Sequence, residues 1–332
     1  MRVPRIGISL GDPGGVGPEI ILKALESVAR PAEAAFVVFG DARVLEAEAA
    51  RQGLRPEWRR RPDAAAPPAP GLYLRDMPTG LKSLASGSAT KENGEASFLF
   101  FEAAVEEARR GALDALVTGP VSKSAWDMAG HKWRGHTEYL ERFYPEAMMT
   151  FWSDRLRVAL LSHHLPLREA LERVRKDVLT GFLRNLHRAL ERAKPEEYSL
   201  LVAGLNPHAG EDGLMGSEEI REIGPAVEAA RAEGIRVDGP FPPDTVYHKA
   251  LGRADIVVVA LTHDQGLIAF KTVSFESGVN ATLGMPFIRT SPDHGTAFDI
   301  AGRGVADATS MKAAVALALD FARPGAAGST PR

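Results

Sequence analysis

RIGISLGDPGGVGPEIILKALESVA, residues 5–29, contains the pattern that decides the fold. Its apolar beginning predicts a β-strand over 5–10. Its end predicts a helix over 18–29, with Pro18 in the first turn, where a missing N–H is tolerated. Between them, the glycines of GDPGGVGPE, 11–19, allow a tight turn and bring backbone amides near a ligand. The stretch is not a clean GxGxxG motif, and a plain strand-to-helix turn explains it equally well.

The rest of the chain alternates in the same way between apolar runs and amphipathic helical stretches. This alternation predicts an α/β fold with a largely parallel sheet. Further strands are predicted at 35–40, 114–119, 156–162, 198–206, 254–262 and 268–275. Further helices are predicted at 95–111, 168–193 and 310–322.

Composition narrows the classes of protein to consider. The chain has 332 residues, is 45% hydrophobic and 25% charged, and carries a formal net charge of −3, as an ordinary globular protein does. This charge gives no general attraction to nucleic acid or to an anionic membrane. There is no cysteine, which excludes disulfides, thiolate metal sites and cysteine nucleophiles. No apolar run approaches the ~18 residues of a membrane-spanning helix, and the N-terminus lacks a signal-peptide core, so we expect a cytoplasmic protein.

Five of the predicted strands run into polar, glycine-rich turns, and three of these turns carry histidine. In open α/β sheets, ligands bind beyond the carboxyl ends of the strands. Three neutral imidazoles with one open position form the arrangement of a catalytic zinc-type site. The candidates are His208, His263 and one of the adjacent pair His163 and His164, between which the residue pattern does not choose. The alternative for each is an ordinary turn histidine that bonds to the backbone.

Two further segments carry groups suited to an anion. His136 and Thr137 stand where a helix is expected to begin, and with the helix amides they offer donors to a phosphate or carboxylate. Lys271, Asn280 and Arg289 are polar residues spaced through an otherwise apolar stretch. They suggest a clamp in which Arg289 gives a bidentate fork and Lys271 a point charge. Helix capping in the first segment and surface exposure in the second are the alternatives.

Eight motifs resemble the 4-hydroxythreonine-4-phosphate dehydrogenase family of vitamin B6 biosynthesis. In family order they are GDPGGVGPE, TGPVSK, AGHKWRGHTE, HLPLR, GLNPHAGEDG, PPDT, HDQG and VNATLGMPFIRTSPDHGTAFDIAG. The first motif and DHGTAFDIAG are also similar to loops of isopropylmalate and isocitrate dehydrogenases. The resemblance implies a homodimer with a two-domain α/α/β sandwich fold and a mostly parallel sheet. It implies two interleaved subdomains with the active-site cleft between them, approximately 1–125 with 265–330, and 126–264.

The resemblance also assigns roles to residues. A divalent metal, zinc, magnesium or cobalt, is shared between the two subunits and falls on His164, His208 and His263, so His163 is not a ligand. The implied substrate contacts are His136, Thr137, Lys271, Asn280 and Arg289. Acidic residues that support the site, as carboxylates behind metal ligands commonly do, are the catalytic candidates Asp244 and Asp264. The loop for the adenosine half of the dinucleotide has the cofactor contacts His294, Gly295, Ala301 and Gly302.

The implied reaction is the metal-dependent oxidation of 4-phosphohydroxy-L-threonine by NAD or NADP. Its product, 2-amino-3-oxo-4-phosphooxybutanoate, loses CO₂ to give 3-amino-2-oxopropyl phosphate on the route to pyridoxal 5'-phosphate. The metal lowers the pKa of the substrate hydroxyl, and the general base is metal-bound hydroxide, Asp244 or a histidine. The expected ligand is thus a small phosphorylated molecule, with neither nucleic acid nor membrane involved.

Three departures from familiar members of the family bear on the substrate. Thr262 stands where an aromatic residue often precedes the His-Asp pair, Thr272 stands where tyrosine often follows the lysine, and GEDG at 210–213 replaces GEGG. A related dehydrogenase of threonate or erythronate 4-phosphate is therefore the alternative. A metal-dependent phosphohydrolase is a rival of a different class, because three histidines beside an anion pocket can activate water; the dinucleotide loop argues against it.

Overall fold

The computed structural model describes residues 3–28, 32–61, 69–81, 87–193 and 198–323. The chain forms two compact units: unit 1 comprises 1–145 and 286–324, and unit 2 comprises 146–285. These limits lie further along the chain than the expected 125 and 265. The reason is that the helix beginning at His136 packs on unit 1, whereas the strand ending at Leu283 pairs within unit 2.

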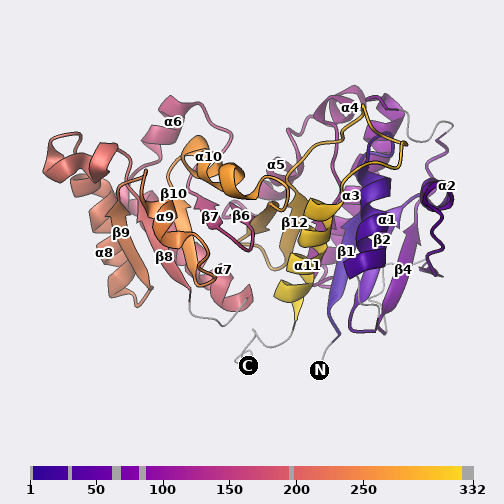
Figure 1. The fold of residues 1–332 in the computed structure, drawn as a ribbon, viewed down its shortest axis with the longest axis horizontal. Coiled ribbons are helices and arrows are strands. Elements are labelled where there is room, and N and C mark those ends of the chain that lie inside the picture. Colours follow the sequence, from indigo (N-terminus) through magenta and orange to yellow (C-terminus); the bar gives the residue numbers. More distant parts are fainter. Residues whose placement is uncertain (1–2, 29–31, 62–68, 82–86, 194–197, 324–332) are drawn as a thin grey trace. The chain divides into compact units, whose positions relative to one another are not determined.

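Unit 1 is built on a parallel sheet (Figure 1). Its strands lie in the order β3-β4-β2-β1-β5-β12, and the neighbouring pairs are parallel. Their bounds are Arg5–Ser9 (β1), Ala35–Gly40 (β2), Arg59–Arg60 (β3), Gly71–Asp76 (β4), Ala115–Thr118 (β5) and Ile288–Pro292 (β12). The central strands β1, β2 and β5 are buried along their whole length, as apolar strands covered on both faces are expected to be.

Helices cover both faces of the unit 1 sheet. On one face, α1 (Gly17–Val28) packs against α11 (Thr309–Ala322), which lies along β5 and β12. On the other, α3 (Lys91–Arg109) lies on β1, β2 and β5. Figure 1 shows indigo α1 and yellow α11 in front of the strands and α3 behind them. The remaining helices of this unit are α2 (Ala42–Gln52), α4 (Lys123–Met128) and α5 (His136–Glu141).

The strand order of unit 1 reverses between β1 and β5. β2 and β4 lie on one side of this point, and β5 and β12 lie on the other. Ligands of open parallel sheets bind at such a switch point. Two turns meet there, since Asp12 N–H donates to Pro120 O and Gly119 N–H donates to Ser9 O, both at 2.9 Å. Gly11 is required at this contact, because its φ is +76° and a Cβ would lie 2.5 Å from the Pro120 oxygen.

Unit 2 has a mixed sheet in the order β11-β6-β7-β10-β8-β9, in which β6 runs antiparallel to both neighbours and the other pairs are parallel. The strands are Met148–Trp152 (β6), Arg157–Leu160 (β7), Ser199–Ala203 (β8), Val237–Phe241 (β9), Ile256–Ala260 (β10) and Val279–Leu283 (β11). The helices are Leu167–Glu172 (α6), Lys176–Ala193 (α7), Pro207–Gly213 (η1), Glu219–Ile223 (η2), Gly224–Ala232 (α8), Val246–Ala250 (α9) and His263–Ser274 (α10). The expected α/β fold with a mostly parallel sheet is confirmed, with β6 as the antiparallel exception. Across the described ranges, no helix is both long and apolar enough to cross a membrane.

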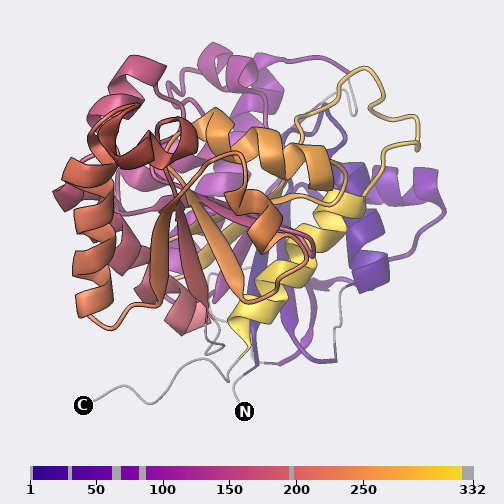
Figure 2. The same ribbon diagram turned by 60° about the vertical axis from the view of Figure 1, so that its left-hand side comes forward.

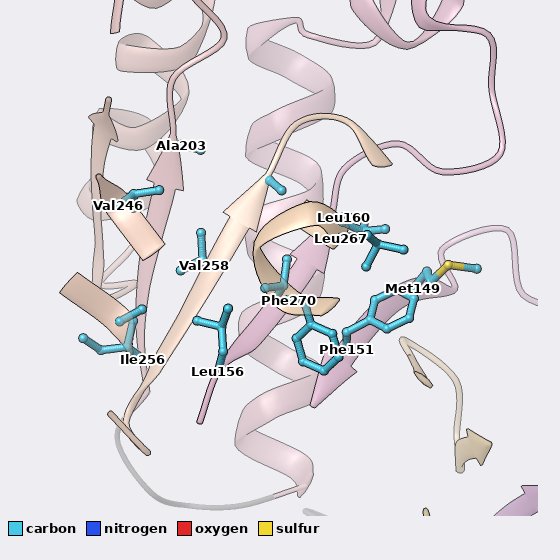
Figure 3. Packing of buried hydrophobic residues seen from close by; sticks show 13 residues of the cluster. Met149, Phe151, Leu156, Leu160, Ala203, Val246, Ile256, Val258, Leu267 and Phe270 are labelled. Atoms are coloured by element: carbon cyan, nitrogen blue, oxygen red, sulfur yellow. The ribbon is translucent and has the colours of Figure 1, made fainter. Parts of the chain in front are cut away.

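A cluster of buried apolar side chains joins the strands of unit 2 to α9 and α10 (Figure 3). Phe151 and Phe270 pack there with ring centroids 5.5 Å apart. The predicted strand at 268–275 is wrong, because α10 takes in all of it but its last residue. Leu267 and Phe270 face the core at helical spacing, and Thr272 Oγ1 donates to the carbonyl four residues back at 2.6 Å. Figure 2 shows α9 and α10, both orange, on one side of the strands.

We predict that Asp12→Asn stabilises the protein at alkaline pH. The Asp12 carboxyl is buried; Oδ1 accepts from Gly14 N–H at 2.9 Å, and Oδ2 has no partner among the described residues. Burial outweighs the Gly14 hydrogen bond and raises the pKa from 3.8 to about 6. Because the folded-state pKa is the higher one, this group's contribution to stability is full below pH 3.8 and is lost as the pH rises through about 6. In urea unfolding, Asp12→Asn should exceed the wild type by about 1–3 kcal/mol near pH 8 and match it near pH 4.

Asp41→Asn is the matched control with the opposite sign. Asp41 accepts from Arg43 N–H at 2.9 Å, and its other oxygen accepts from the N–H and hydroxyl of Thr79, both at 2.8 Å. Burial acts to raise the Asp41 pKa, but the bonds from Thr79 and Arg43 leave it lowered. Its contribution is present above the ordinary pKa and lost as the pH falls, so Asp41→Asn should be destabilised near pH 8. Equal stability of wild type and Asp12→Asn at that pH would contradict the prediction.

Candidate active site

A buried arginine spans from β12 to the end of β5. Arg289 has 4% of its surface exposed. Its Nε and Nη2 donate to Thr118 Oγ1 at 2.9 and 2.7 Å, and Nη2 also contacts His136 Nδ1 at 3.0 Å. Within the described chain no carboxylate forms an ion pair with it, although Glu138 acts on it through space. Burial lowers the Arg289 pKa to about 9, so the side chain is still a cation at neutral pH.

The contact with Arg289 determines the tautomer of His136. A guanidinium has only donors, so His136 Nδ1 accepts and the neutral ring carries its proton on Nε2. Nε2 is buried and has no partner among the residues that the structure describes. Burial, followed by the positive charges of Arg289 and Lys123, holds the His136 pKa well below its ordinary value. Unit 1 therefore contains a buried cation on Nδ1 of His136 and a buried N–H group at Nε2 of the same ring, and an anion would be favourable for each of them.

The other members of the expected anion clamp are divided between the units. Thr137 is buried in the first turn of α5 and so lies with the histidine and arginine of unit 1. Lys271 on α10 and Asn280 on β11 belong to unit 2. The Asn280 Oδ1 atom is buried and lacks a partner in the described ranges. Thr118 was not among the predicted contacts; its signals were its place at the end of a predicted strand and at the start of the motif TGPVSK.

The histidine turns lie at one edge of the unit 2 sheet, since they follow the neighbouring parallel strands β7, β10 and β8. The ring centroids of His164 and His263 are 5.8 Å apart, and those of His163 and His164 are 5.3 Å apart. His263 Nδ1 lies 2.7 Å from Asp264 Oδ1. A neutral His263 donates through Nδ1 to this carboxylate, which leaves the Nε2 lone pair available to a metal.

His208 lies in a turn with an unusual backbone. Residues 208–212 all have φ between +45° and +84°, and His164 has φ +49°. Left-handed backbone is unfavourable for residues other than glycine and is concentrated at functional sites. Glu219, buried on η2, fixes the turn by accepting from the backbone and side-chain N–H groups of Asn206 at 2.7 and 2.9 Å. No sequence pattern pointed to Glu219.

Gln265 ties two of the histidine turns together. Its Nε2 donates to Gly204 O, before the His208 turn, and its Oε1 accepts from Leu261 N–H, both at 2.7 Å. Among the described residues, however, no three His, Asp or Glu side chains are grouped closely enough to hold a metal ion. Asp244 is exposed in the turn before α9.

The predicted cofactor loop follows β12 and contacts the glycine-rich turn after β1. Val16 N–H donates to Thr296 O at 2.9 Å, and a Cβ at Gly15 would lie 2.7 Å from that oxygen. The end of the loop is held by Lys23 of α1, which donates to Ala306 O at 2.8 Å across 283 residues of sequence. The loop carries all four predicted cofactor contacts, His294, Gly295, Ala301 and Gly302.

Comparison with known proteins covers nearly the whole chain. The family model described as Pyridoxal phosphate biosynthetic protein PdxA matches residues 32–318. A 4-hydroxythreonine-4-phosphate dehydrogenase of Desulforapulum autotrophicum is 41% identical over 330 residues, which cover 95% of this chain and 94% of that protein. A Symbiobacterium thermophilum protein named "Putative D-threonate 4-phosphate dehydrogenase" is 40% identical, with 96% and 97% covered.

The same family appears among solved structures. The crystal structure of 4-hydroxythreonine-4-phosphate dehydrogenase from Klebsiella pneumoniae is 38% identical and has a TM-score of 0.84, with 96% of this chain and 100% of that chain covered. Identity of this extent over nearly the full length leaves no large region of either chain outside the match. The chain belongs to the PdxA family, that of the 4-hydroxythreonine-4-phosphate dehydrogenases.

Proposed function

We propose that this dehydrogenase oxidises 4-phosphohydroxy-L-threonine with NAD or NADP and a divalent metal. The observation that carries the proposal is the contact between Arg289 and His136. A buried guanidinium without a carboxylate is unfavourable until an anion completes it, and the His136 Nε2–H needs an acceptor. A phosphate supplies both the negative charge and several acceptor oxygens. The substrate in the name of the 41% identical relative carries such a phosphate.

In the proposed reaction, the substrate hydroxyl loses its proton, and its carbon gives a hydride to NAD⁺ or NADP⁺. The resulting 2-amino-3-oxo-4-phosphooxybutanoate loses CO₂ to form 3-amino-2-oxopropyl phosphate. Arg289, His136 and Thr137 hold the phosphate, and Lys271 and Asn280 complete the substrate site. The loop that carries His294, Gly295, Ala301 and Gly302 binds the nucleotide.

His164, His208 and His263 would hold the divalent metal, which is zinc, magnesium or cobalt. The residues fit such an ion, because Asp264 faces His263 Nδ1 and leaves Nε2 for coordination. A bound divalent ion lowers the pKa of a coordinated hydroxyl. A second subunit would complete this site.

We infer a homodimer that shares its active sites. Exposed apolar side chains follow two of the histidine turns: Leu167 is 65% exposed, Leu214 84% and Ile220 58%. Exposed apolar surface beside a site marks interaction surfaces when it is contiguous, and these side chains follow the proposed metal ligands closely in the sequence. A second copy that buries them brings its own histidine turns to the same interface as His164 and His208 of the first.

The alternative substrate is threonate or erythronate 4-phosphate, which lacks the amino group. The 40% identical relative with D-threonate 4-phosphate in its name favours it. Both substrates offer the same phosphate to Arg289, so the residues of unit 1 do not distinguish them. Thr272, one of the residues that depart from the family pattern, directs its hydroxyl to the helix backbone. A phosphohydrolase has no support, since these relatives are named as dehydrogenases.

Reduction of the nucleotide, followed by its absorbance, tests the function directly. Purified protein with a divalent metal and NAD⁺ or NADP⁺ should turn over 4-phosphohydroxy-L-threonine faster than threonate or erythronate 4-phosphate. A chelator should abolish turnover, and added metal should restore it. Turnover of the sugar-acid phosphates alone would select the alternative. Release of inorganic phosphate without nucleotide reduction would refute the dehydrogenase.

Arg289→Lys should raise the KM for the phosphorylated substrate at least about tenfold while kcat changes less than about threefold, because a single ammonium cannot span Thr118, His136 and the phosphate as the planar guanidinium does. The control is Arg253→Lys, at an exposed ion pair with Asp255 at 2.7 Å, which should leave both constants unchanged. An unchanged KM in Arg289→Lys would remove this residue from the phosphate site.

His208→Ala should lose bound metal and lower turnover by at least about 100-fold, because it removes a metal ligand. Metal content per subunit, measured by atomic emission on the purified dimer, checks this result. His248→Ala, at an exposed histidine on α9, is the control and should retain both metal and activity. Full metal content in His208→Ala would show that His208 is not a ligand.

A further inference from the structure

Two aromatic side chains enclose His136 in unit 1. The imidazole lies edge-on to Phe101 of α3, with centroids 4.6 Å apart at 68°, and to Trp126 of α4, 5.5 Å apart at 86°. Phe101 and Trp126 are wholly buried and stack on each other at 5.8 Å. With Arg289 on Nδ1, the ring is held on several sides, and Nε2 is left as its polar atom without a partner in the described structure.

Trp126 is itself held by a chain of hydrogen bonds. Its Nε1 donates to Ser97 Oγ at 2.9 Å, and Ser97 Oγ donates to Gly94 O at 3.0 Å. Helices α3 and α4 approach so closely at Gly94 that a Cβ there would lie 2.0 Å from the Ala125 oxygen. Glycine inside a helix costs about 1 kcal/mol relative to alanine, and here it permits the contact that brings the indole to His136.

We propose that Trp126 is a positioning residue for phosphate recognition, which orients His136 so that its Nε2–H faces the phosphate of the substrate. The inference rests on the proposed function. The indole acts through the imidazole and does not itself touch the substrate. A half-turn of the imidazole about its Cβ–Cγ bond would put Cδ2 where Nδ1 lies and Cε1 where Nε2 lies, so Arg289 would lose its acceptor and the N–H donor would leave the phosphate. Packing against Phe101 and Trp126 opposes that rotation.

The arrangement selects the ionised form of the phosphate. Arg289 and His136 offer only donors, which suit oxygens without protons, so the dianion is preferred over the monoanion. The charged groups that act on this pair are Lys123 from α4 and Glu138 from α5. KM for the substrate should therefore fall as the pH rises through about 6, the second pKa of a phosphomonoester. Protonation of His136 should not lower KM.

Nitrogen-15 NMR of histidine in the full chain tests the proposal. His136 is assigned by the signal that His136→Gln removes. In the free wild type it should show the Nε2-protonated tautomer and no titration between about pH 6 and pH 8. Trp126→Phe and the milder Ser97→Ala should give mixed tautomers or titration of His136. Both variants should raise KM about three- to tenfold and change kcat by less than about twofold. The KM change is this small because only a fraction of one charged hydrogen bond is lost.

Trp152→Phe is the matched control, because Trp152 Nε1 donates to Thr150 Oγ1 at 2.8 Å, within unit 2. Trp152→Phe loses the same kind of bond and should leave the His136 signals and KM unchanged. A second control, Ser97→Thr, should restore the wild-type His136 signals. An Nδ1-protonated His136 in the wild type would overturn the proposal. So would unchanged His136 signals in both Trp126→Phe and Ser97→Ala. The NMR result concerns the free protein, so it stands or fails independently of which substrate is turned over.

Discussion

The unpaired charge of Arg289 is the constraint on which the unit 1 site depends. A guanidinium removed from water is unfavourable by several kcal/mol unless it is paired, and among the described residues only Thr118 and His136 bond to it. The parallel pairing of β12 with β5 makes this arrangement possible, because Arg289 lies opposite Leu116 and its long side chain reaches the end of β5. The tautomer of His136 and the need for an anion both follow from this one cation.

In unit 2, strand order and not burial brings the candidate site residues together. Three turns that carry histidine meet because β7, β10 and β8 are neighbours and run the same way. Two side chains then hold the turn after β8: Gln265 donates to Gly204 O, and Glu219 accepts from Asn206 N–H. The left-handed backbone at His208 persists because such bonds determine it. The turn that carries His208 is thus held by Gln265 and Glu219, neither of which is among the predicted metal ligands.

The loop after β12 shows how segments near the two ends of the chain are joined. The turn after β1 and the loop after β12 are joined by Val16 and Thr296, and Lys23 holds the end of the loop. Glu19 accepts from Lys23 Nζ and from Ala306 N–H, both at 2.8 Å. Both family motifs therefore belong to one structure beside the switch point of the unit 1 sheet, where parallel sheets bind their ligands.

By itself the sequence determined the alternation of strands and helices, the turns after β1, β7, β8 and β10, and the family resemblance, because apolar periodicity and turn residues are local properties. The same local reasoning predicted a strand at 268–275, where only the shared core position of Leu267 and Phe270 shows a helix. It also gave no strand for β12, which begins two residues after Pro286 and ends at Pro292.

Only the tertiary structure decided which groups face each other. Arg289 meets Thr118 and His136 across 171 and 153 residues, and Trp126 reaches His136 because α3 and α4 approach closely at Gly94. Such contacts depend on strand order and helix packing, which bring distant segments together and which no local pattern encodes. The proton position on His136 depends on those contacts, so it too is a property of the folded chain.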